Sequence, residues 1–170
     1  MSFTTSSQIG VDLNNPSSTA LFTLGQKVLG NNDSEWTYVI ATGTLTTGMC
    51  CSIFSAGTAY AFTTALINGG DTAGTTGFLD MGFAQFTIPQ GQYGFVVRRG
   101  INMYVACTGT VPPVNVALSP TAGVLITALA AAVGNTALGI FITTSASTAT
   151  LSVAQAILTF PRPAAATPLA

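Results

Sequence analysis

The chain has 170 residues and a formal net charge of −1, from four basic and five acidic residues. Only 5% of its residues are charged, compared with about 25% in an average soluble domain, while 48% are hydrophobic. So few basic residues leave no stripe of positive charge for gripping nucleic acid, and we expect no nucleic-acid partner. Soluble monomers usually keep charges spread over their surface, so this composition favours a surface that other subunits cover. The length is that of one domain.

The first 18 residues are rich in Ser, Thr and Asn and carry only isolated apolar side chains, so we expect an extended arm. Ile9, Val11 and Leu13 alternate with the period of a strand. Together with Phe3 they are candidate partner-binding residues, because such an arm can add a strand to the sheet edge of a neighbour. The alternative is an ordinary unstructured terminus. The segment lacks the basic and apolar regions of a signal peptide.

Short stretches rich in aromatic and β-branched residues follow one another after the arm, with Gly, Asn, Pro and Ser between them. We expect strands at 21–30, 35–42, 49–54, 59–66, 78–88, 93–99, 101–108, 114–118, 124–130, 137–143 and 151–160. Such short spacings are typical of a β-barrel or β-sandwich. We therefore predict an all-β fold, with one compact β-barrel or β-sandwich domain of about ten short strands. This domain spans residues 19–161, between an extended N-terminal arm (1–18) and a Pro/Ala-rich C-terminal tail (162–170).

Residues 82–100 have the pattern of a β-hairpin, with strand formers at 83–88 and 93–99 around Pro89 and Gly91. The second strand ends in Arg98 and Arg99, half of the basic residues in the chain. Arginine makes planar, bidentate contacts with carboxylates, so these two residues are candidates for binding an acidic partner. The alternative is a solvated strand end whose aliphatic stems lie on apolar surface.

The residues offer little for catalysis. The chain has no His, which removes the usual general base and a common metal ligand, and its five carboxylates are scattered. We predict no enzyme activity, no cofactor and no metal site. Cys50 and Cys51 are adjacent, so on a strand their side chains point to opposite faces. With Cys107 they are expected to be buried, reduced thiols, or one of the pair forms a disulfide with Cys107.

An apolar run at 122–142 has the length of a membrane span. Gly134 and Asn135 interrupt it, and no charged or aromatic residues flank it as membrane anchors would. Two buried strands joined by a turn explain this run better, and we expect no membrane partner.

Several dispersed motifs resemble a known family. The stretches 22–25, 30–39 and 41–43 resemble the opening of small head proteins of tailed bacteriophages, whose pattern is Leu-Gly, a Gly/Asp turn, an aromatic strand and Ala-x-Gly. The stretch 92–100 is similar to an aromatic strand of that family that ends in Arg-Gly, and 158–161 is similar to its closing strand. This chain has fewer charges and a longer apolar run at 124–142.

The resemblance implies a capsid decoration, or cement, protein. Such a protein binds the outside of a phage head, bridges neighbouring major capsid subunits and forms homo-oligomers, with a trimer as the first expectation. It would be made in the host cytoplasm and end on the capsid exterior of the virion. Two alternatives stay open: a phage tail, fibre or spike component, and a carbohydrate-binding module that stacks sugars on Trp36, Tyr38 and Tyr93.

Overall fold

The computed structural model describes residues 12–54, 56–61, 78–108, 117–118, 125–126, 137–143 and 152–163, and these residues form strands and turns without a helix. The strands are β1 (Lys27–Gly30), β2 (Ser34–Ala41), β3 (Cys50–Phe54), β4 (Thr58–Ala61), β5 (Phe78–Ala84), β6 (Tyr93–Thr108), β7 (Ala117–Leu118), β8 (Leu125–Ile126), β9 (Ala137–Ile142) and β10 (Ser152–Pro163). The prediction of an all-β fold is confirmed. β10 ends two residues beyond the boundary predicted for the C-terminal tail.

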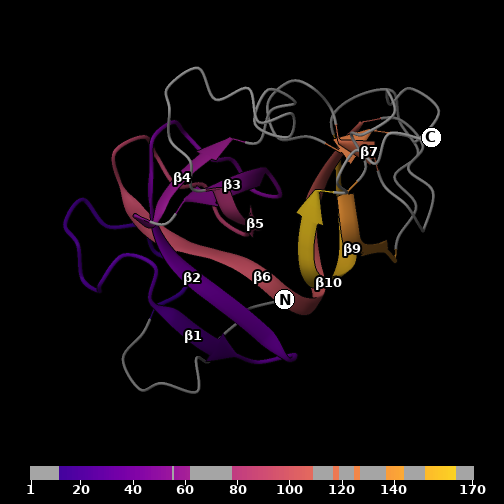
Figure 1. The fold of residues 1–170 in the computed structure, drawn as a ribbon, viewed down its shortest axis with the longest axis horizontal. Helices are drawn as coiled ribbons and strands as arrows, with labels where there is room; N and C mark the ends of the chain where they lie inside the picture. Colours follow the sequence, from indigo (N-terminus) through magenta and orange to yellow (C-terminus); the bar gives the residue numbers. More distant parts are fainter. Residues whose placement is uncertain are drawn as a thin grey trace, which may run out of the picture.

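Five strands close into a barrel. Around the ring β2 pairs with β4, β4 with β3, β3 with β5 and β5 with β6, and β6 returns to pair with β2. All these pairs are antiparallel except β2 with β4, which is parallel. Of the two architectures that the sequence allows, the structure therefore shows the barrel (Figure 1).

The long strand β6 belongs to the barrel and to an extension beside it. Its first half pairs with β2 and β5, and its second half pairs with β10, which in turn pairs with β9. Figure 1 shows β6 crossing from the barrel strands on one side of the view to β9 and β10 on the other. At Ile101 and Asn102 the register between β6 and β10 shifts, because two residues of β6 lie opposite one residue of β10. From the sequence, residues 98–100 are either a short connector between two strands or a bulge, and the structure shows one continuous bulged strand.

The side chains form two cores, one on each face of the barrel strands. The smaller core lies inside the barrel, because all five ring strands contribute to it: Val39, Ala41, Leu45, Cys51, Ile53, Ala59, Ala84, Ile88 and Val96. The larger core lies between the outside of the barrel and the extension, and it includes Trp36, Tyr38 and Cys50. Trp36 and Tyr38 therefore face away from Val39, and Cys50 away from Cys51, as the alternation predicts.

The barrel interior is closely packed beside Gly94. A Cβ added to Gly94 would lie 2.8 Å from Cδ1 of Ile88, which occupies the space beside it. Ile88 also pairs with Leu45 rather than with β6. The predicted hairpin at 83–99 is therefore shorter than expected: β5 ends at Ala84, and only Phe83 and Ala84 pair directly with β6.

Part of the predicted arm lies against the chain's own barrel. Leu13 is 9% exposed and belongs to the outer core, and Ser17 forms a β-bridge with Tyr93. Further along, the ring of Phe22 packs edge-on against Tyr38, with ring centroids 5.2 Å apart. The backbone N–H of Leu21 donates to the Tyr38 hydroxyl at 3.1 Å. These contacts fix the chain from residue 13 to the start of β1 on the outer face of the barrel.

Candidate functional site

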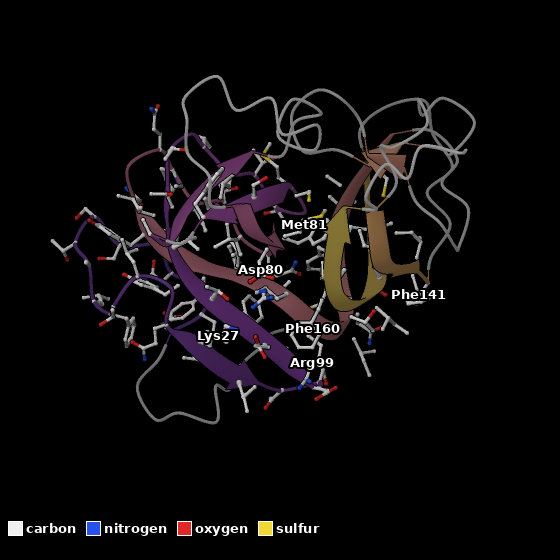
Figure 2. The ribbon with its side chains drawn as sticks, in the orientation of Figure 1. Lys27, Asp80, Met81, Arg99, Phe141 and Phe160 are labelled. Carbon is white, nitrogen blue, oxygen red and sulfur yellow. The ribbon has the colours of Figure 1, made fainter. Side chains whose placement is uncertain are left out.

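One end of the barrel carries most of the described charges, and we call this set of residues the barrel-end cluster. Its members are Lys27, Asp33, Glu35, Asp80, Arg98 and Arg99. Figure 2 labels Lys27, Asp80 and Arg99 of this set, with Phe160 beside Arg99. Three basic and three acidic side chains cancel one another, so the cluster has no net charge.

Arg98 is the centre of the cluster. Its side chain is buried, and its two Nη atoms reach carboxylates on two other strands: Nη2 bonds to Asp80 on β5, and Nη1 lies 3.5 Å from Glu35 Oε1 on β2. Alternation along these strands puts Glu35 on the face of Val39, and Asp80 on the face of Ala84, both of which line the barrel interior. The guanidinium therefore ties three barrel strands together where the interior ends.

The position of Arg98 follows from a bulge in β6. Glu35 pairs with Arg99 and Trp36 pairs with Val97, so Arg98 is an extra residue with no opposite residue on β2. Its Nε and the nearby Thr37 hydroxyl are buried without a hydrogen-bond partner among the described residues. A buried polar group without a hydrogen bond costs about 1–3 kcal/mol, which offsets part of the stabilisation that the ion pairs of Arg98 contribute.

Arg99 and Phe160 form the outer layer of this end. Arg99 donates from Nη2 to Asp33 Oδ1 at 2.7 Å and from Nε to the Asp33 carbonyl at 3.1 Å. The ring of Phe160 lies over both guanidinium groups, with its centroid 5.5 Å from Arg98 Cζ and 5.4 Å from Arg99 Cζ. Such cation–π contacts contribute about 0.5–2 kcal/mol.

The backbone is irregular at this end. Phe160 has a φ of 52°, unusual for a bulky residue, in a segment where β10 and β9 slip out of register between Leu158 and Arg162. Asn32, Asp33 and Asn102 have φ values of 57°, 54° and 60°. The turn that holds Asn32 and Asp33 is joined to β6 by a hydrogen bond from the Ile101 N–H to the Asn32 carbonyl.

The structure places the candidate partner-binding residues in different environments. Phe3, Ile9 and Val11 lie outside the described residues. Leu13 is packed into the chain's own core, and both arginines have carboxylates of their own chain. The alternative prediction, that the arginines lie at a solvated strand end, is wrong for Arg98, because this residue is 6% exposed. That these residues contact a partner stays a prediction.

The acidic partners of the arginines had no signal in the sequence. Asp80 is 18 residues and Glu35 is 63 residues from Arg98, and only closure of the barrel brings them together. The composition of the strands predicts apolar surface beyond the core, but not which side chains form it. The larger ones are Leu21, Leu29, Ile101, Phe141, Val153 and Phe160. Alternation within 151–160 would have found Val153, because it lies out of phase with the buried Ala154, Ala156 and Leu158.

The three cysteines are free and buried, so the predicted alternative of a disulfide with Cys107 is wrong. Burial raises the pKa of the Cys51 thiol to about 12 and that of Cys107 to about 11. The pKa of Cys50 is also raised, by burial first and by its neighbour Cys51 second. Thiols held in the protonated form are poor nucleophiles and poor metal ligands.

The described ranges also bear on the metal, membrane and sugar sites that the sequence raises. No group of three or more Cys, Asp or Glu side chains is placed there to hold a metal ion. None of these segments forms a helix long and apolar enough to cross a bilayer. The predicted sugar-stacking platform of Trp36, Tyr38 and Tyr93 is wrong. Trp36 and Tyr38 are each 2% exposed, because their rings lie in the outer core, so they cannot stack on a sugar.

No protein-family model matches the chain, and no curated protein matches it. Among solved structures, the chain is similar to the N base of the head fiber gp8.5 of bacteriophage phi29. The TM-score is 0.41 and the sequence identity 9%, over 72% of this chain and 92% of that chain. A likeness at this level carries no argument about what this chain does.

Proposed function

We propose that the chain is a structural protein of a phage virion, which binds the outer surface of the capsid and bridges neighbouring major capsid subunits. The sequence motifs that resemble small phage head proteins support the proposal, and so does a small barrel without an assembled catalytic site in its described part. The observation that carries it is the distribution of charge. Six charged side chains neutralise one another at one barrel end, and large apolar side chains are exposed both beside them, as Phe160 is, and on the extension, as Phe141 and Val153 are.

A neutral surface with exposed apolar residues suits burial against other proteins. Burial of apolar surface contributes roughly 25 cal/mol per Å², and no unpaired charge of the barrel-end cluster has to be desolvated. A capsid offers the same binding site many times. Molecules that also contact one another on this lattice gain strength by avidity, so each single interface can be modest.

Sedimentation with capsids tests the proposal. Purified chain mixed with heads that lack it is expected to pellet with them and to saturate at a fixed number of copies per head. Because the cluster is internally neutral, we expect the binding to change little between low and high salt. A chain that stays in the supernatant at saturating concentration contradicts capsid binding. Binding to purified tails alone would move the role to a tail or fibre component.

A further inference from the structure

Among the described strands, the outermost strand of the extension has one edge that no other strand pairs with. β9 is the last strand in the order of the sheet and pairs with β10 on one side. Within the described residues no strand pairs with its other side. Natural proteins usually protect such edges with Lys, Pro, a bulge or a covering segment, because unpaired backbone groups recruit strands from other chains. The β9 sequence, Ala-Leu-Gly-Ile-Phe-Ile, contains no charge and no Pro.

The register tells which backbone groups point outward. Ile142 lies opposite Ala156, and the N–H of Thr143 donates to the carbonyl of Gln155 at 2.8 Å. In an antiparallel pair, residues that bond to the partner strand alternate with residues that do not. Phe141 therefore bonds to β10 like Thr143, while Ile140 and Ile142 direct their N–H and C=O groups away from β10, toward the edge that no described strand pairs with.

The side chains beside this edge are apolar. Ile140 and Ile142 are buried in the outer core, whereas Phe141, which lies between them, is 45% exposed. Phe141 lies opposite Ile157 of β10, and Val153, on the same face as Ile157, is 50% exposed. Figure 2 shows Phe141 beside β9, on the side away from the barrel. The only charged residue of β9 and β10 is Arg162, near the end of β10.

We propose that β9 pairs antiparallel with the β9 of a second copy of this chain, so that the two extensions form one continuous sheet. Pairing about a two-fold axis is self-complementary: each outward N–H of one strand meets an outward C=O of the other. Identical neutral faces also meet without like-charge repulsion, so Phe141 and its neighbours can be buried across the axis. The inference deepens the proposed function, on which it rests, by naming the face through which copies contact each other.

The mass of the chain in solution tests the pairing. Light scattering at micromolar concentration is expected to give a dimer or a multiple of it, and Phe141→Lys is expected to weaken association at least tenfold. Leu21→Lys is the matched control, since Leu21 is 65% exposed but lies in the segment before β1. It should leave association unchanged. A monomeric wild-type chain, or equal effects of the two lysines, overturns the proposal.

Amide hydrogen exchange gives a second test on the wild-type chain. The amides of Ile140 and Ile142 should become protected as the concentration rises, while those of Phe141 and Thr143, which bond to β10, should not change. Protection of Ile140 and Ile142 that does not depend on concentration would mean that the edge is paired within one chain, and would overturn the proposal.

Head binding separates the dimer interface from the proposed function. A dimer that fails to bind heads keeps the interface and removes the capsid role, whereas a monomer that binds heads does the reverse.

Discussion

At the scale of single residues, burial decides the chemistry of the cysteines. The pKa of each thiol is raised because the folded chain offers no solvent to a thiolate. The weak hydrogen bond from Cys51 Sγ to the Gly82 carbonyl, at 3.4 Å, also uses the protonated form. The thiols therefore behave as small apolar side chains. The sequence allows either buried, reduced thiols or a disulfide with Cys107, and the structure shows the former.

The raised pKa of Cys51 predicts a loss of stability in alkali. An unfolded thiol ionises near pH ~8.5–9, whereas the folded Cys51 keeps its proton to about pH 12. Its contribution to stability is therefore complete below the unfolded pKa and is lost as the pH rises toward the folded pKa. By pH ~10 we expect a loss of about 1–2 kcal/mol for this thiol.

Urea unfolding of the wild-type chain and of Cys51→Ala, from neutral pH to pH ~10, measures this loss. The wild type should lose about 1–2 kcal/mol more than the variant over this range, because the variant lacks the thiol. The other ionisable groups are present in both proteins, so the difference between the proteins reports on Cys51. A gap between the two proteins that stays constant with pH would show that Cys51 ionises equally in both states.

At the scale of elements, Arg98 links three strands of the barrel through Asp80 and Glu35. Removal of a buried partner from such a group leaves the other charges without compensation, which costs about 3–5 kcal/mol in a fully buried pair. Both carboxylates are partly exposed, so solvent reduces this cost. We expect Arg98→Ala to lower the free energy of unfolding by about 2–3 kcal/mol.

Chemical unfolding of Arg98→Ala and Arg99→Ala compares an inner with an outer arginine of the same cluster. Arg99 pairs with the exposed Asp33, so its removal should cost about 1 kcal/mol or less. Equal losses for the two variants would contradict the view that Arg98 closes the barrel end. A loss for Arg98→Ala that disappears at high salt would contradict its burial.

The strands could be predicted from the sequence, but their partners could not. Trp36, Tyr38 and Val39 show their faces by simple alternation, because the period of a strand is local. The pairing of β2 with β6 joins residues about 60 apart in the chain, as in Trp36 with Val97, and no local pattern encodes it. The same holds for the site: the arginines are conspicuous in sequence, whereas Asp80 and Glu35 become their partners only when the ring closes. An irregularity at 98–100 could be read from the sequence as a connector or a bulge, but not that it turns Arg98 toward Asp80 and Glu35.

At the scale of the whole molecule, the described surface is close to neutral at the barrel end and on the extension, and both carry exposed apolar side chains. The barrel end holds ion pairs that are satisfied within the chain, and the extension presents a neutral apolar edge at β9. Such a molecule gains stability when other subunits cover it, and its small charge gives it little to keep it apart from them. A repeated lattice is the setting in which both properties are useful, and this is the physical reason for proposing a virion role.

The most direct test of this account is electron cryo-microscopy of virions purified from the same source. We expect density for the chain at regular positions on the outside of the head, with each copy across a boundary between major capsid subunits and with β9 against another copy. Virions whose heads lack such density, or that carry the chain only on the tail, would contradict the capsid role.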